Sequence, residues 1–185
     1  MPLTTQTLIW LFPIAFMLHD FEEVILGEPW LKKNAGDVLA RLPRRVPAFL
    51  TKQIRDVFAK SAGEFAFTVG LIFALVALSA FLALEAGQYA FFLLASGGFF
   101  LHGFMHVGQA VLLRRYVPAV ITSLVIAIPY GLLLFPRLIQ QGVVSLPGLL
   151  VYFLLSIVLL GPFIFVIHFV GAFLYKSAIR VLIGS

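Results

Sequence analysis

Residues 64–84 read EFAFTVGLIFALVALSAFLAL, and after Glu64 this run contains no charged side chain. A helix of about 20 mostly apolar residues is long enough to cross the hydrocarbon core of a membrane. The run is continuously apolar, so it lacks the alternation of apolar and polar residues that is typical of a transmembrane β-strand. Residues 64–84 therefore predict a transmembrane α-helix.

The composition of the whole chain agrees with a membrane-embedded protein. Of its 185 residues, 62% are hydrophobic and only 11% are charged, whereas soluble domains are about 45–50% apolar and about 25% charged. The chain has no Cys, which excludes disulfides, thiolate metal ligands and a cysteine nucleophile. The net charge of +5 does not by itself indicate nucleic-acid binding, because in a membrane protein the positions of the basic residues matter more than their total.

Four further stretches have the length and the apolar character of membrane spans. We therefore expect an all-α, polytopic transmembrane bundle that forms one domain over residues 1–185. Proline residues at positions 13, 129 and 162 lie inside spans and predict kinks. Small residues from Ser96 to Gly108 predict close packing of other helices on the third span. The five expected spans are residues 5–27, 64–84, 88–113, 117–135 and 147–175.

The segment between the first two spans, residues 28–63, is strongly basic. Within it, residues 49–60 place apolar side chains on one helical face and mostly basic side chains around the remainder. This pattern predicts a short amphipathic helix that lies in the membrane interface. A solvated amphipathic connector is the alternative interpretation.

The distribution of basic residues predicts the orientation of the chain. Five spans place 12 of the 13 Lys and Arg residues on one side of the membrane and only Arg137 on the other. Because cytoplasmic loops are enriched in Lys and Arg, we expect the N-terminus outside and the C-terminus in the cytoplasm. The predicted location is the plasma membrane of the cell, and no cleaved signal peptide is expected.

The first span ends in ionisable residues, which inside a membrane are costly and mark functional sites. The sequence here is His19-Asp20-Phe21-Glu22-Glu23. His19, Glu22 and Glu23 stand at positions i, i+3 and i+4 and are expected to share one helical face. Asp20 lies about 100° around the helix from His19 and is expected to point elsewhere.

Histidines in later spans complete this set. His102 and His106 are four residues apart, the spacing by which one helix presents two imidazoles to a metal ion. His19, His106 and His168 each lie about 12 Å from the cytoplasmic end of their spans. This shared depth favours one metal site with Glu64 and His168 as possible completions, and its expected core members are His19, Glu22, Glu23, His102 and His106. The alternatives are an interhelical hydrogen-bond network, a core role for His168 and a helix-start role for Glu64.

These residues resemble a known family. Residues 19–23 match the H-x-x-E-E motif of the HXXEE-domain family of small, several-spanning membrane proteins. The resemblance implies that His19, Glu22 and Glu23 carry the named motif, and that His102, His106 and less directly His168 are the additional histidines of the family. These histidines imply an enzymatic role, but the resemblance names no substrate.

The ligand types narrow the chemistry. Nitrogen and oxygen donors without sulfur suit zinc, iron or manganese, in a mononuclear or a dinuclear site. We expect zinc, because the paired E-x-x-H pattern of di-iron bundles is missing. Glu23 is the expected carboxylate ligand, and Glu22 is the expected general base of the reaction.

The position of the site indicates its substrate. A metal site at headgroup depth, beside a basic loop that attracts anionic lipids, favours metal-assisted hydrolysis of a membrane lipid or another apolar small molecule at the cytoplasmic leaflet. Three alternatives remain: a non-enzymatic protein with a structural metal or hydrogen-bond cluster, a metal-ion transporter, and a di-iron oxidase.

Overall fold

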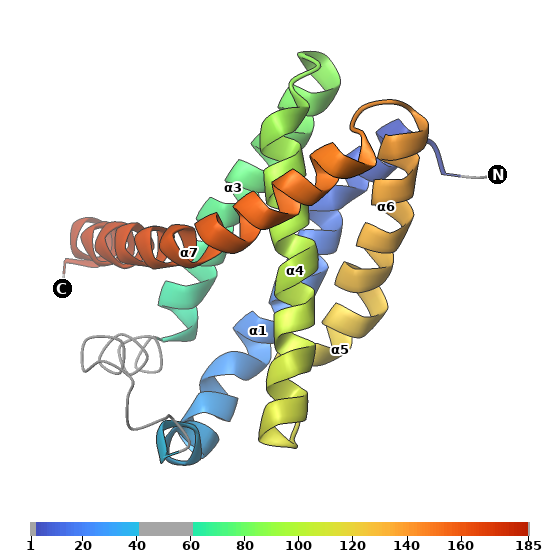
Figure 1. Ribbon diagram of the computed structural model, residues 1–185. Coiled ribbons are helices and arrows are strands. Elements are labelled where there is room, and N and C mark those ends of the chain that lie inside the picture. The colour runs from blue at the N-terminus through green and yellow to red at the C-terminus, as the bar shows by residue number, and fades with distance from the viewer. Residues whose placement is uncertain (1–2, 41–60, 185) are drawn as a thin grey trace.

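The computed structural model describes residues 3–40 and 61–184, which form helices joined by short turns and contain no strand. The predicted all-α bundle is confirmed (Figure 1). The predicted interfacial helix over residues 49–60 lies outside the described residues. The elements are α1 (Thr5–Ala40), α3 (Ala62–Glu85), α4 (Tyr89–Leu113), α5 (Val120–Thr122), the π-helix η1 (Ser123–Ala127), α6 (Ile128–Gln140) and α7 (Leu146–Ile183).

Four of the helical stretches that the structure describes are long and apolar enough to cross a membrane. They are α3, α4, residues 120–140 and α7. This makes the protein a membrane protein by the length and composition of its helices. The other long helix, α1, is not one of these four; it carries Asp20, Glu22 and Glu23 close together, and it runs through the same bundle (Figure 1).

Helix α1 is longer than predicted. The expected first span ended at Gly27, but the helix continues to Ala40 and holds Pro29 inside it. Its last turns are seen end-on in Figure 1, so the helix changes direction at this point. A proline in a helix interior removes one hydrogen bond and bends the helix without necessarily ending it. The extension is then held by the turn that follows α4, because Trp30 Nε1 donates to the Tyr116 carbonyl at 2.7 Å.

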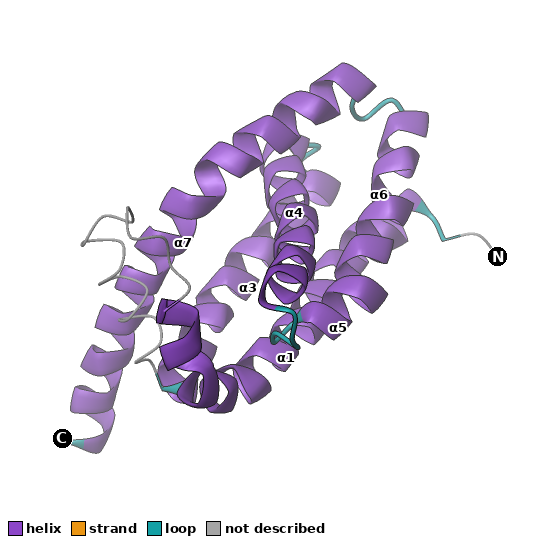
Figure 2. Ribbon diagram, turned by 60° about the horizontal axis from the view of Figure 1, so that its bottom comes forward, coloured by secondary structure: helices purple, strands orange, loops and turns teal. Residues whose placement is uncertain are grey.

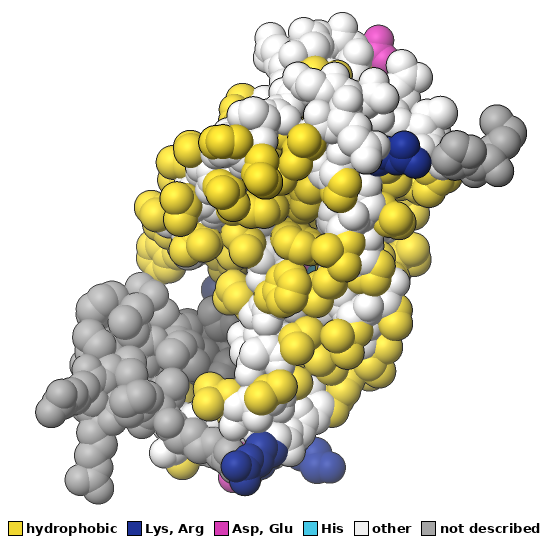
Figure 3. Space-filling model, turned by 45° about the vertical axis from the view of Figure 1, so that its right-hand side comes forward, with side chains coloured by type: hydrophobic (Ala, Val, Ile, Leu, Met, Phe, Trp, Pro, Cys, Tyr) yellow, Lys and Arg dark blue, Asp and Glu magenta, His cyan; other side chains and the backbone are white. Residues whose placement is uncertain are grey.

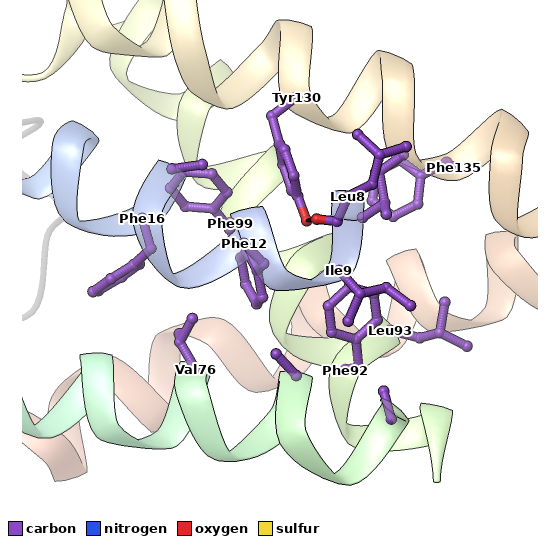
Figure 4. Packing of buried hydrophobic residues seen from close by; sticks show 14 of the residues in the cluster. Leu8, Ile9, Phe12, Phe16, Val76, Phe92, Leu93, Phe99, Tyr130 and Phe135 are labelled. Atoms are coloured by element: carbon purple, nitrogen blue, oxygen red, sulfur yellow. Dashed lines mark hydrogen bonds between the residues drawn. The ribbon is translucent and has the colours of Figure 1, made fainter. Parts of the chain in front are cut away.

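An aromatic core fixes α1 against α4 and α6 (Figure 4). The Phe12 ring meets the rings of Phe92, Phe99 and Tyr130, with centroids 5.5, 5.7 and 5.9 Å apart. The Tyr130 hydroxyl donates to the Leu8 carbonyl at 3.0 Å, which satisfies a buried phenol between two helices. Because His19 lies two turns after Phe12, this packing also sets the position of the histidine.

Small residues allow the close helix approaches that the sequence predicted. A side chain on Gly97 would meet Ser156 and Phe153 of α7, and a side chain on Gly103 would meet Ala127 of η1. On α7 itself, any side chain at position 171 would overlap the side chain of Thr68 of α3. Backbone contacts of this kind are how helices pack in lipid.

The irregularity predicted at Pro129 takes the form of the π-helix η1, which directly precedes the first turn of α6. π-Helical turns widen a helix locally and occur often beside functional sites. Here the wide turn packs against α4 at Gly103, one residue after His102.

The surface of the described residues agrees with a membrane environment. Figure 3 shows a broad hydrophobic band, with Lys and Arg side chains gathered at its two ends. The long helix α7 lies obliquely across α3 and α4 (Figure 2) and leaves large apolar side chains exposed, among them Leu154, Val158 and Phe169. In a bilayer these side chains would face lipid.

Candidate metal centre

Three histidines from two helices meet inside the bundle. His19 of α1 and His102 and His106 of α4 each offer one ring nitrogen, and these atoms all lie within 4.8 Å of one another. His19 is completely buried, and His106 is 5% exposed. On the face drawn in Figure 3, almost no His side chain is visible at the surface. The sequence predicted this meeting of the motif with the i, i+4 histidine pair.

Glu23 completes the group with a carboxylate. Its Oε1 lies 3.0 Å from His106 Nε2, and the same nitrogen lies 2.8 Å from His102 Nε2. A single nitrogen cannot donate its proton to the carboxylate and also accept one from the other ring. One proton therefore cannot satisfy His106 Nε2, His102 Nε2 and Glu23 Oε1 together. A cation bound between these three atoms would satisfy all of them.

The side chain of Thr122 connects the other face of His19 to Glu22. The Thr122 hydroxyl donates to Glu22 Oε2 at 2.7 Å and lies 3.2 Å from His19 Nδ1. Because the Thr122 hydroxyl gives its only proton to Glu22, its oxygen has to act as the acceptor towards His19, and His19 carries a proton on Nδ1. This leaves the lone pair of His19 on Nε2. Metal-bound histidines are oriented in this way by a hydrogen bond to their other nitrogen.

Glu22 makes all its hydrogen bonds within the described residues on the α5 side of α1. It accepts the backbone N–H of Thr122 at 2.8 Å and that of Ile121 at 3.4 Å, where helix N–H groups lack intrahelical partners. The Tyr116 hydroxyl also donates to it at 2.6 Å. Burial and this carboxylate raise the pKa of Tyr116 well above its usual value, so the phenol remains a donor. Glu22 and Glu23 therefore diverge, as expected for adjacent residues of a helix, whose side chains lie about 100° apart.

The types and spacing of the donor atoms fit a bound metal ion. His19 Nε2 is buried and has no hydrogen-bond partner in the described part of the chain. Two nitrogens held by one tetrahedral zinc ion at about 2.0–2.1 Å would lie about 3.3 Å apart. The three histidines would reach that spacing with small side-chain movements. Three imidazoles and one carboxylate are nitrogen and oxygen ligands of the kind that zinc, iron and manganese accept.

A large cavity of about 800 Å³ lies beside this cluster, between α1, α3, α4 and α7. Glu23, His102 and His106 form part of its wall, and most of the remaining wall is apolar. Ligand sites in proteins are clefts of about 300–1,000 Å³ with few polar groups among apolar ones. The cavity therefore offers a path by which an apolar molecule can reach the histidines.

Asp20, which the sequence analysis set aside, also lines this cavity. Its side chain is 6% exposed, and its Oδ2 has no hydrogen-bond partner among the described residues. The residues of α1 on the cavity wall include Phe16, Asp20, Glu23, Gly27 and Leu31, which recur at spacings of three and four. Asp20 thus shares a helical face with Glu23. The three-residue spacing to Glu23 was the signal available in the sequence.

The two remaining predicted residues lie outside the three-histidine group. His168 of α7 lines the cavity and stacks on Phe65, with ring centroids 5.7 Å apart. Glu64 lies in the first turn of α3, where its backbone N–H donates to the Ser61 side chain at 3.2 Å.

A different acid, Glu28 of α1, holds this end of α3 by accepting the Ala62 N–H at 2.7 Å. A salt bridge to Lys32 at 2.6 Å and the Ala62 bond lower the pKa of Glu28.

The fold and the cluster together define a polytopic helical membrane protein with a buried group of three histidines at its centre. A model of the HXXEE family, described as "Protein of unknown function with HXXEE motif", matches residues 10–134, and the chain belongs to that family. No curated protein and no solved structure matches the chain. The matched range contains the motif, the histidine pair and Thr122.

Proposed function

We propose that this protein is an integral membrane metalloprotein in which His19, His102, His106 and Glu23 bind one transition-metal ion. Zinc is the preferred ion, with iron or manganese as the other candidates for such a donor set. The observation that supports this proposal is the convergence of three histidine ring nitrogens and a carboxylate oxygen, where His19 Nε2 has no hydrogen-bond partner in the described chain.

We further propose that the site is that of a metal-dependent enzyme, hydrolase-like in its chemistry, acting on a lipid or an apolar small molecule. The bound metal would supply Lewis-acid polarisation and an activated water molecule. Support comes from the cavity of about 800 Å³, which reaches two of the histidines and Glu23. A purely structural site needs no such opening. A transporter needs a polar path to the far side, whereas this cavity is largely apolar.

The residues of the chain have distinct roles in this proposal. Glu23 is a ligand, as the sequence predicted. We give Glu22 a positioning role instead of the predicted role of general base, because its oxygens are engaged by Tyr116, Ile121 and Thr122. Asp20 is then the carboxylate nearest in sequence to Glu23 that lines the cavity, and it is the new candidate for proton transfer.

Turnover of lipid tests the enzymatic proposal. We expect zinc-loaded protein in vesicles made from a total lipid extract to consume one lipid class, followed by mass spectrometry over time. The chelated protein and His106→Ala should leave the extract unchanged, because neither would hold the metal. Asp20→Asn should keep its zinc and lose at least about tenfold in rate if Asp20 transfers a proton. Unchanged lipid with fully loaded wild-type protein would refute the enzymatic proposal.

We also propose that the basic end of the bundle faces the cytoplasm. The extension of α1 and the end of α4 meet at this end, where Arg115 bonds Asn34 and Asp37 at 2.7 and 3.1 Å. Reporter proteins fused within residues 41–60 and after Ser185 should both be active in the cytoplasm. An external C-terminus together with a cytoplasmic 41–60 segment would contradict the five-span arrangement.

A further inference from the structure

The cavity beside the histidines is long. Phe91 and Leu113 of α4 both line it, and at about 1.5 Å per residue they lie about 33 Å apart along the helix. With a volume of about 800 Å³, the cavity has room for an extended alkyl chain along this length.

The two halves of the cavity differ in chemistry. On the side of Phe91 the wall is formed by apolar residues of α3, α4 and α7, such as Val76, Leu94 and Leu160. The one polar side chain there, Ser156, already donates to the Leu94 carbonyl at 3.0 Å. Polar groups begin at the level of Asp20 and the histidines. An occupant would therefore place its chain towards Phe91 and its polar group at Asp20.

Asp20 requires a partner that the described protein does not provide. A carboxylate buried in apolar surroundings is costly unless hydrogen-bond donors or a positive charge satisfy it. Its Oδ2 has no such partner among the described residues, yet the side chain lies on the cavity wall. An ammonium group supplies both a donor and a charge, and a hydroxyl group supplies a donor.

We propose that the cavity binds an amphiphile whose amino or hydroxyl head is hydrogen-bonded by Asp20 and whose chain lies between α3, α4 and α7. This inference deepens the proposed function, because it names the substrate class of the same site. A fatty acid fits less well, because an ionised carboxylate brings no hydrogen-bond donor for Asp20 Oδ2.

Photolabelling in the membrane tests this inference. The probes are a long-chain amine, alcohol and carboxylic acid of equal chain length, each with a diazirine in the chain, added to protein in phosphatidylcholine vesicles. We expect saturable labelling of cavity residues such as Val76, Leu94 and Leu160 by the amine and the alcohol, and competition by the unlabelled compounds. The exposed Leu154 should be labelled without saturation, because it faces lipid. A comparison of the amine probe with the alcohol probe shows whether a positive charge on the head group strengthens binding to the cavity.

Two variants separate head recognition from chain binding. Asp20→Leu should lower saturable labelling by the amine and alcohol about tenfold or more, the effect of losing one hydrogen bond to a charged group. Ala95→Phe, which fills the apolar half of the cavity, should abolish it, whereas Leu154→Phe on the lipid face should not. Three results would overturn the inference. They are equal labelling by all three probes, labelling of lipid-facing residues alone, and saturable labelling that survives both Asp20→Leu and Ala95→Phe.

The same measurement distinguishes this inference from the metal proposal. Labelling is performed on chelated protein and again after zinc loading, and saturable labelling is expected in both states. Saturable labelling of a protein that never binds metal would refute the proposed metalloenzyme and leave the amphiphile site standing. A protein that binds about one zinc ion but shows no saturable labelling would refute the amphiphile site alone.

Discussion

Replacing His106 by alanine should remove the bound metal. His106 Nε2 is the atom that lies between His102 Nε2, at 2.8 Å, and Glu23 Oε1, at 3.0 Å. Loss of this nitrogen takes away one ligand and separates the remaining ones. Outer hydrogen-bond partners of metal ligands contribute about 10–100-fold to metal affinity, and a direct ligand should contribute at least as much. Elemental analysis of the purified variant should find less than about a tenth of the wild-type zinc.

His168→Ala is the matched control for this variant. It also removes one histidine from inside the bundle, but His168 stacks on Phe65 outside the three-histidine group. The control should keep its zinc within about twofold of wild type. Equal zinc contents in His106→Ala and wild type would show that the proposed ligand set is wrong. A loss of zinc in His168→Ala would return this residue to the site, as the sequence first predicted.

Replacing Thr122 by valine should weaken zinc binding by about 10–100-fold while leaving every proposed ligand in place. Valine keeps the shape of threonine but lacks the hydroxyl that links Glu22 Oε2, at 2.7 Å, to His19 Nδ1, at 3.2 Å. Without this link, His19 loses the hydrogen bond that leaves its Nε2 free for a metal. The affinity is measured by competition with a chelator of known strength.

Thr122→Ser and Glu22→Gln test whether the link acts as a unit. Thr122→Ser retains the hydroxyl and should bind zinc within a few-fold of wild type, which a purely structural role of the methyl group would not predict. Glu22→Gln and Thr122→Val should weaken binding by less than the product of their separate effects, because both break the same chain of contacts. If Glu22→Gln keeps full zinc affinity and loses only turnover, Glu22 is the general base that the sequence predicted.

The helical bundle could be predicted because membrane spans follow from local composition. A run such as residues 64–84 has to be helical in lipid, since no water is present to satisfy its backbone. The end of α1 could not be predicted in the same way. The helix passes Pro29 because Trp30 and Asn34 gain partners at Tyr116 and Arg115, from the turn that follows α4.

The candidate site was predictable where one helix carries the whole pattern. The spacing of His102 and His106 depends on helix geometry alone, and the equal depth of His19 and His106 in their spans indicated that the two helices bring these residues together. The motif also indicated that the adjacent Glu22 and Glu23 have different roles, but not which groups α5 and α4 present to each side of α1. Thr122 and Tyr116 were missed for the same reason, since a hydroxyl far along the chain gives no spacing signal.

X-ray absorption spectroscopy at the zinc edge, on wild-type protein purified without chelators and loaded with zinc, tests the metal site most directly. The proposed site predicts about one zinc ion per chain, with nitrogen and oxygen ligands at about 2.0–2.1 Å and the outer-shell scattering of three imidazole rings. An absence of tightly bound zinc, or a zinc ion surrounded by oxygen without imidazole scattering, would contradict it. The histidines and Glu23 would then form a buried hydrogen-bond network instead of a metal centre.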